Sequence, residues 1–415
     1  MSGIAIQEAT ERAVALRGAL AERVVIADGA MGTMLQASDV TPEDFDGHDG
    51  CNEVLNVTRP DVVGDIHRAY LAVGADCVTT NTFGANLGNL SEYGIPERIG
   101  ELSQAGAAVA REVADEFTAA DGRIRWVLGS IGPGTKLPTL GHVTFRELRD
   151  SYYENAAGLL RGGADALIIE TCPDLLQAKA AIVGTKRAVA DLAPGAVVIA
   201  SLTIETTGTM LLGTEIGAAL TALAPLGIDV IGLNCATGPD LMSEHLRYLA
   251  ANSPIPVSCE PNAGLPQLTA DGAYYPLTAA ELADAHERFA VEFGLSLVGG
   301  CCGTTPEHVA TLVERLGVTA ARPGGLAAKP RSPRPEPGVA SLYNHVPFRQ
   351  DTAFLAIGER TRAGTPPGRA AVTPSRSTRA ATCSGVVPQQ PPTSEIPNST
   401  ANRSCASASS AAVSG

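Results

Sequence analysis

The chain has 415 residues, a hydrophobic content of 45% that is ample for a core, and a formal net charge of −14. This acidic balance argues against nucleic acid or an anionic membrane as a partner, because either would need a basic face. No apolar run reaches the roughly 18 residues that a membrane helix requires, and the charged pattern of residues 1–21 is unlike a signal peptide. We therefore expect a cytoplasmic protein whose cysteines remain thiols.

Short apolar runs rich in β-branched residues alternate with longer helical patterns from residue 24 to residue 316. This alternation is typical of a parallel sheet with helices on its faces. The expected strands lie within residues 24–33, 76–86, 126–135, 166–174, 197–205, 229–239, 256–264 and 295–304. The expected helices cover residues 60–73, 95–117, 145–162, 174–191, 214–225, 239–250, 278–293 and 305–316. Eight such units predict an α/β fold of the (β/α)8 type, a TIM barrel, within residues 1–322.

In a (β/α)8 barrel, functional residues gather where the strands reach their carboxyl ends. The expected ends carry polar or thiol groups, namely Asp28, Asn81, Ser130, Glu170, Thr203, Asn234, Cys235, Glu260, Asn262, Cys301 and Cys302. The alternative for any single residue is that polarity simply begins where a strand stops. The sequence thus predicts an active site on this rim.

Three cysteines on this rim are candidates for metal binding. Cys235 ends the sixth expected strand, and Cys301 and Cys302 end the eighth, so the barrel would bring their thiols together. Three thiolates with an open fourth position describe a catalytic zinc site. The two adjacent thiols can face one ion only if the backbone bends, which the glycines beside them permit. Buried structural thiols, or a disulfide between the adjacent pair, remain alternatives on the cysteines alone.

Five motifs carry a resemblance to a known family: ADGAMGTML (27–35), TNTFGAN (80–86), IIET (168–171), GLNC (232–235) and GGCCGTTPEH (299–308). They resemble the zinc-dependent homocysteine S-methyltransferase family, and in particular the N-terminal module of the cobalamin-dependent methionine synthases. The resemblance covers roughly residues 10–361. It implies one Zn2+ per chain on Cys235, Cys301 and Cys302, with homocysteine sulfur in the open position attacking a methyl group to give methionine. The implied donor is methylcobalamin, supplied by a domain missing from this chain.

The resemblance also implies how homocysteine is held. Asp28 and Glu170 would bind its amino group, and backbone N–H groups near Ala30 and Met31 would receive its carboxylate in a glycine-permitted turn. A turn role for Asp28 and an ion pair for Glu170 are the structural alternatives. Asn262 would be a neutral zinc ligand while substrate is absent, or would fix a turn. The further pocket-lining candidates are Thr80, Asn81, Ser130 and Thr203.

The chain changes character after the predicted barrel. Residues 323–350 form a Pro-rich linker that we expect to be too poor in apolar residues to pack. Residues 351–361, which end in FLAIGERT, resemble the opening of the synthases' methyltetrahydrofolate-binding domain. Residues 362–415 contain no Leu and no aromatic residue, and we expect them to be disordered. Their abrupt bias suggests a shifted reading frame, with a genuine extension as the alternative.

Three functions therefore remain open at this point. The first is the homocysteine half-reaction of a methionine synthase, with the cobalamin- and folate-binding domains of an intact synthase as partners. The second is a stand-alone homocysteine S-methyltransferase that uses S-methylmethionine or betaine. The third is a non-catalytic zinc- or thiol-binding fragment. The histidines of the expected helices are predicted to pack or to face solvent, because none lies at a strand end.

Overall fold

The computed structural model describes residues 3–269, 272–321, 323–329 and 336–348. The predictions for residues 351–361 and 362–415 lie outside the described residues. One sheet contains β1 (Val25–Ile26), β2 (Cys77–Thr79), β3 (Trp126–Ile131), β4 (Ala166–Cys172), β5 (Val197–Leu202), β6 (Val230–Asn234), β7 (Val257–Glu260) and β10 (Leu297–Val298). Two hairpins pair β8 (Gln267–Thr269) with β9 (Gly272–Tyr274), and β11 (Gly338–Ala340) with β12 (His345–Pro347).

The large sheet is parallel and closes into a barrel. Its strand order is β1-β10-β7-β6-β5-β4-β3-β2, so β1 and β2 stand at its two ends. Asp76, just before β2, donates its backbone N–H to the carbonyl of Ile26 in β1 at 2.7 Å, and the Ile26 N–H donates to the Asp76 carboxylate at 3.0 Å. These bonds join the two ends of the sheet. The predicted (β/α)8 barrel is confirmed.

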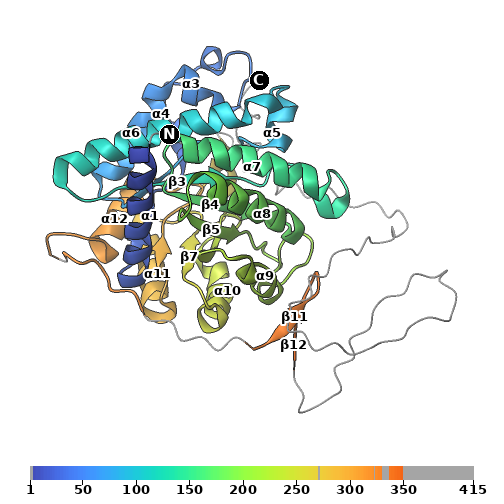
Figure 1. Cartoon of the computed structure of the whole chain (residues 1–415). Coiled ribbons are helices and arrows are strands. Elements are labelled where there is room, and N and C mark those ends of the chain that lie inside the picture. The colour runs from blue at the N-terminus through green and yellow to red at the C-terminus, as the bar shows by residue number, and fades with distance from the viewer. Residues whose placement is uncertain (1–2, 270–271, 322, 330–335, 349–415) are drawn as a thin grey trace.

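Helices surround the barrel strands (Figure 1). They are α1 (Gly3–Glu22), α2 (Met31–Gln36), α3 (Leu55–Thr58), α4 (Pro60–Ala72), α5 (Leu87–Glu92), α6 (Ile99–Asp121), α7 (Phe145–Arg161), α8 (Leu175–Leu192), α9 (Ile216–Leu223), α10 (Pro239–Asn252), α11 (Ala279–Phe293) and α12 (Pro306–Leu316). Several begin at the N-cap residues that their sequences offer. The Thr144 and Thr278 side chains each accept a backbone N–H in a capping box, and Asp174 caps α8 in the same way without the reciprocal bond.

The interior of the barrel is apolar near the amino ends of the strands and polar near their carboxyl ends. Side chains two residues apart on a strand share a face, so Leu128 and then Ser130 point inward from β3, and Ile168 and then Glu170 point inward from β4. The apolar layer is a buried cluster closed by Leu16 and Leu20 of α1. The strand bodies therefore supply stability, and their ends are free to carry a site.

At the amino ends of the strands, the same set of contacts around an aspartate is repeated before β2, β4 and β6. An aspartate precedes each of these strands, accepts a backbone N–H from the neighbouring odd-numbered strand, and pairs with an arginine in or just after α1. The ion pairs are Arg23–Asp76 at 2.6 Å, Arg12–Asp165 at 2.6 Å and Arg17–Asp229 at 2.8 Å. The N–H donors are those of Ile26, Val127 and Val198, respectively. We call these three arrangements the aspartate brackets.

The prediction that residues 323–350 would not pack is wrong for the parts that the structure describes. Before the gap at 330–335, Leu326 packs against the core and its carbonyl accepts the N–H of Val24 at 2.8 Å. The β11–β12 hairpin lies against α9. Thr214 Oγ1 donates to the carbonyl of Leu342 at 2.6 Å, and the N–H of Glu215 donates to the carbonyl of Tyr343 at 2.8 Å. The hairpin is attached through backbone hydrogen bonds, which a hydrophobicity pattern does not reveal.

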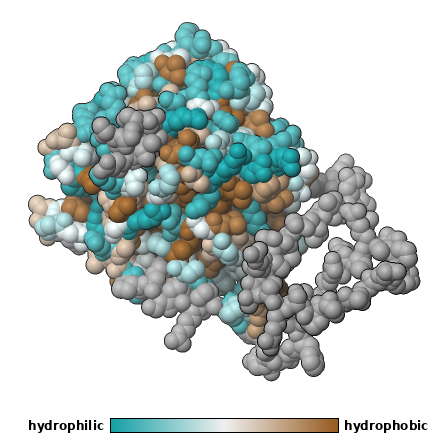
Figure 2. Space-filling model, in the orientation of Figure 1, coloured by the Kyte–Doolittle hydropathy of each residue, from teal (hydrophilic) through white to brown (hydrophobic). Residues whose placement is uncertain are grey.

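Within the described part of the chain, no helix has the length and apolar character needed to cross a membrane. On the face that Figure 2 shows, hydrophobic residues are interspersed among hydrophilic ones. Such a mixed surface is ordinary for a folded domain.

Candidate metal centre

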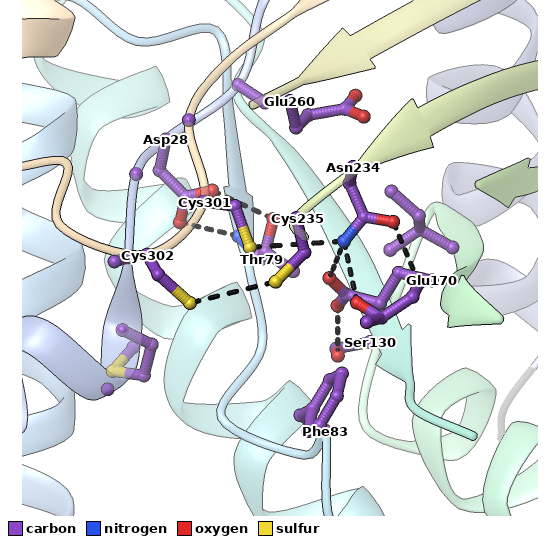
Figure 3. A pocket seen from close by; sticks show the side chains of 18 of the residues that line it. Asp28, Thr79, Phe83, Ser130, Glu170, Asn234, Cys235, Glu260, Cys301 and Cys302 are labelled. Carbon is purple, nitrogen blue, oxygen red and sulfur yellow. Dashed lines mark hydrogen bonds between the residues drawn. The ribbon is translucent and has the colours of Figure 1, made fainter. Parts of the chain in front are cut away.

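A cavity opens at the carboxyl ends of the barrel strands (Figure 3). Its lining includes the carboxylates of Asp28, Glu53, Glu170 and Glu260 and the thiols of Cys235, Cys301 and Cys302. Among the described residues that line it there is no Lys, Arg or His. The cavity is therefore suited to a metal cation or to the cationic group of a small ligand.

The three predicted cysteines come together at this cavity. Their sulfur atoms all lie within 4.8 Å of one another, and the Sγ atoms of Cys235 and Cys302 are 3.9 Å apart. Tetrahedral zinc with Zn–S bonds of about 2.3 Å places its sulfur ligands about 3.8 Å apart. The spacing of these thiols thus fits three ligands of one zinc ion.

The backbone bends sharply where it presents the thiols. Cys235 and Ala236 have φ values of 58° and 54°, in the left-handed region that residues other than glycine rarely enter. Gly303, directly after the cysteine pair, has a φ of 79°. At Gly300, an added Cβ would lie 2.4 Å from the Thr304 side chain. The predicted glycine-dependent bend is present in the chain.

One thiol of the cluster, Cys301, resists ionisation when no cation is bound. Sulfur contacts with Cys235 and Cys302, together with burial, raise the pKa of the Cys301 thiol well above its usual range. A divalent cation would compensate the charge of the thiolates and lower that pKa. The donor set therefore has the chemistry of a metal site.

Asp28 and Glu170 both lie in the cavity wall without a cationic side chain beside them. Asp28 accepts hydrogen bonds from the Thr79 N–H at 2.7 Å and from the Thr79 Oγ1 at 2.8 Å. Glu170 accepts one from Ser130 Oγ at 2.5 Å. Burial raises the pKa of each carboxyl group to about 7. Within the described ranges, neither residue forms an ion pair, so the structural alternative for Glu170 is not supported.

The turn after β1 differs in detail from its prediction. The N–H of Ala30 donates to Thr304, at 3.1 Å to Oγ1 and 3.3 Å to the carbonyl oxygen. Ala30 is therefore already engaged, and it is the N-cap of α2. The N–H groups of the first helical turn have no acceptor within the helix itself. Of the two predicted donors, Met31 at the start of α2 is the one better placed for a carboxylate.

Asn81 and Asn262 are both buried and both engaged with the protein itself. Asn81 lines the cavity, but its Nδ2 donates to the carbonyl of Asn52 at 2.7 Å and to Asn56 Oδ1 at 3.1 Å. The Oδ1 of Asn262 accepts the N–H of Cys302 at 3.1 Å. That oxygen would have to give up this bond in order to bind a metal ion.

The remaining predicted residues divide between the site and the core. Thr80 and Ser130 line the cavity, whereas Thr203 is buried outside the described lining. His67 and His286 are fully buried in α4 and α11, as their predicted packing role requires.

Three residues of the cavity had been given no specific role from the sequence, although Asn234 and Glu260 were among the expected strand-end residues. Thr79 holds Asp28, Asn234 contacts several groups around the thiols, and Glu260 is a further buried carboxyl. Burial, and then the charge of Glu170, raise the pKa of Glu260 well above its usual range. The alternation of side chains along β2 could have indicated Thr79. Thr79 lies two residues after Cys77, so both side chains point to the inward face of the strand.

The fold and the site together define a (β/α)8 barrel with a cluster of three thiols, spaced as metal ligands are, at the carboxyl ends of its strands. The sequence profile of the family described as Homocysteine S-methyltransferase matches residues 25–316, which include the barrel strands and all three cysteines. The chain belongs to the homocysteine S-methyltransferase family, and its barrel is a methyltransferase domain.

Curated relatives agree with this assignment. The chain is 58% identical over 344 residues to the methionine synthase of Mycobacterium tuberculosis (strain ATCC 25618 / H37Rv), and 57% identical to that of Mycobacterium leprae (strain TN). Each match covers 83% of this chain but only 28% of the relative. The chain thus spans little more than a quarter of the length of these relatives.

Solved structures share the fold. The oxidised form of the homocysteine methyltransferase MmuM from Escherichia coli matches with a TM-score of 0.59 and 24% identity, covering 70% of this chain and 96% of that one. Its metallated form matches with the same TM-score and 23% identity, covering 71% and 96%.

Proposed function

We propose that this chain binds one Zn2+ through Cys235, Cys301 and Cys302 and activates homocysteine for methylation to methionine. The observation that carries this proposal is the mutual approach of the three sulfur atoms within 4.8 Å at the mouth of the barrel. Bound Zn2+ would leave a fourth position for the substrate sulfur and lower the pKa of its thiol, so that the nucleophilic thiolate forms at neutral pH.

The chain's own residues would bind and orient the rest of the amino acid. The carboxylates of Asp28 and Glu170 suit the ammonium group, since both are buried in a wall without cationic side chains. An ammonium group beside them would lower both pKa values again and keep both groups ionised. The first turn of α2, starting at Met31, would donate N–H groups to the substrate carboxylate. Asn81 lines the same cavity and completes its wall.

The proposed methyl donor is methylcobalamin, carried by another domain and recharged from methyltetrahydrofolate. The methionine synthase relatives support this choice, because they are much longer than this chain and thus have room for cobalamin- and folate-binding domains. On the same grounds, we propose residues 1–322 as the homocysteine-binding domain and residues 351–361 as the start of the next one. Free thiols at the metal centre suit the reducing cytoplasm.

The test of this function is metal analysis combined with zinc X-ray absorption, with and without homocysteine. We expect about one zinc per chain, bound by three sulfurs, with a fourth sulfur added by homocysteine. Cys235→Ser should lose the metal. Cys77→Ala, which removes a buried thiol from the apolar layer near the amino ends of the strands, should keep it. A zinc-free wild-type chain, or equal zinc content in both variants, would rule out the proposed centre.

The donor is tested separately, on the zinc-loaded chain. Methionine formed from exogenous methylcobalamin, but not from S-methylmethionine or betaine, is the expected result. Methionine formed from either of those two small donors would instead identify a stand-alone methyltransferase. Failure of homocysteine to add a sulfur to the metal would identify a non-catalytic zinc-binding fragment.

A further inference from the structure

The side-chain amide of Asn234 lies between the Glu170 carboxylate and the thiols of the proposed zinc site (Figure 3). Asn234 is the last residue of β6 and is 1% exposed. Its Nδ2 donates to Thr171 Oγ1 at 2.7 Å, approaches Glu170 Oε2 at 3.4 Å, and lies 3.9 Å from Cys301 Sγ. Its Oδ1 accepts the N–H of Thr171 at 2.8 Å. One amide thus contacts both the proposed ammonium-binding carboxylate and a proposed zinc ligand.

The bonds from Asn234 hold a strained segment of β4. Thr171 has a φ of 57°, in the left-handed region that β-branched residues rarely adopt because it is strained for them. The register between β4 and β5 also shifts between Ile169 and Cys172. As a result, the consecutive residues Glu170 and Thr171 both line the cavity, although regular strand neighbours point to opposite faces. Asn234 bonds both the N–H and the hydroxyl of Thr171, so it fixes this irregular backbone.

We propose that Asn234 is a positioning residue that fixes the distance between the Glu170 carboxylate and the metal thiolates, and thereby selects homocysteine over cysteine. This inference rests on the proposed function. The two amino acids differ by one methylene group between the ammonium and the thiol. A site anchored at both ends discriminates between them only if the spacing of its anchors is rigid. Asn234 supplies that rigidity, because it is bonded to the β4 bulge and adjoins both the carboxylate and a sulfur.

Four variants test the proposal: Asn234→Ala, Thr171→Gly, the double variant, and Asn155→Ala as a matched control. Asn155 is another buried asparagine, on α7, whose amide donates to the carbonyl of Ala85 outside the described cavity lining. Glycine at position 171 adopts a positive φ without strain, so the bulge no longer depends on Asn234. The readouts are zinc content, melting temperature, and the Kd of the zinc-loaded chain for homocysteine and for cysteine.

We expect Asn234→Ala to keep about one zinc per chain but to bind homocysteine about 10–100-fold more weakly. Binding of cysteine should change less, so the preference for homocysteine falls. The double variant should recover about tenfold of the lost affinity, because Glu170 returns to its position once the strain is gone. Asn155→Ala should leave both Kd values unchanged, even if it lowers the melting temperature.

Three results would overturn the inference. One is an Asn234→Ala chain with wild-type affinity and selectivity; the second is a folded double variant that binds no better than Asn234→Ala. The third is an equal loss of affinity for homocysteine and cysteine. A wild-type chain that binds neither zinc nor homocysteine would instead overturn the proposed function itself, so the two failures are distinguishable.

Discussion

Asp28, a residue of the proposed ammonium site, is buried at the expense of stability. Its carboxyl group is 3% exposed, and burial raises its pKa from 3.8 to about 7, against the opposing effect of the two hydrogen bonds from Thr79. The folded chain therefore binds a proton more readily than the unfolded chain between pH 3.8 and about 7. Consequently, the contribution of this group to stability declines as the pH rises through that interval.

Replacing Asp28 by Asn should remove this penalty. The amide oxygen can still accept the Thr79 N–H, and the amide nitrogen can donate to the Thr79 hydroxyl, so both contacts of the turn survive. We expect the metal-free Asp28→Asn chain to be more stable than wild type by about 2–4 kcal/mol at pH 8, with little difference near pH 4. Urea unfolding of both chains at the two pH values measures this.

The same substitution should weaken homocysteine binding by about tenfold or more, because an ammonium group loses a charged partner. Calorimetry on the zinc-loaded chain provides this measurement. Equal stability of the two chains at pH 8 would mean that Asp28 is not strained by burial. Unchanged homocysteine affinity would remove Asp28 from the proposed ammonium site.

At this scale, the sequence predicted which thiols and carboxylates would gather around the cavity better than the side chains that hold them there. The gathering of Cys235, Cys301 and Cys302 could be predicted because each follows a strand in a distinctive motif and the barrel places those strand ends together. The roles of Thr79 and Asn234 depend on contacts between segments that are far apart in the sequence. A contact such as that from Asn234 to Thr171 spans 63 residues, and no local pattern encodes it.

At the scale of elements, the aspartate brackets organise the amino ends of the strands. Asp76 is 2% exposed and accepts hydrogen bonds from Arg23, Arg123 and the N–H of Ile26. It therefore sits where β1 meets β2 and where the barrel closes. The other two brackets repeat the arrangement before β4 and β6, so α1 is tied to three alternate strands.

Asp76→Ala should lower the free energy of unfolding by about 3–5 kcal/mol, because it leaves largely buried guanidinium groups without their partner. Asp150→Ala provides the comparison, since Asp150 pairs with Arg149 and Arg187 at the surface, and its loss should change stability by about 0.5 kcal/mol or less. Chemical denaturation of both variants is the measurement. A loss in Asp76→Ala no larger than that in Asp150→Ala would show that this bracket does not stabilise the closed barrel.

The elements themselves follow closely from the sequence. The predicted helix 145–162 is α7 (Phe145–Arg161), and the predicted helix 278–293 is α11 (Ala279–Phe293), because capping boxes mark both starts. The predicted strand regions extend well beyond the strands, since they include the irregular rim: 24–33 contains only Val25–Ile26 as a strand. The β11–β12 hairpin was missed because hydrogen bonds from Thr214 and Glu215, just before α9, to backbone carbonyl groups hold it.

At the scale of the whole molecule, the stabilising contacts and the proposed site lie at opposite ends of one barrel. The apolar layer and the brackets lie toward the amino ends, and the thiols and carboxylates lie at the carboxyl ends. This division agrees with the general behaviour of (β/α)8 barrels. It also explains why strained residues such as Cys235 and Thr171 are tolerated at the rim, where the remainder of the fold supports them.

Metal binding should nevertheless stabilise the whole fold, because the thiols come from two separate segments, which follow β6 and β10. An ion that binds the folded chain and not the unfolded chain stabilises it by about 4 kcal/mol when its concentration is about 1,000 times its Kd. We expect a strong chelator to lower the melting temperature, and zinc to restore it. In Cys235→Ser, neither treatment should have an effect. Melting that is insensitive to the chelator in the wild-type chain would argue against a metal that bridges these segments.

The brackets also have a consequence for the order in which the chain folds. The helix α1 is synthesised before the barrel strands, yet Arg12 and Arg17 pair with aspartates 153 and 212 residues further along the chain. The helix can therefore dock fully only after β4 and β6 have been made and paired. Contacts of such long sequence separation form slowly, so we expect α1 to dock late in folding. Until α1 docks, Leu16 and Leu20 do not cover the barrel at the amino ends of its strands. The apolar interior of the incomplete sheet is then exposed to other chains.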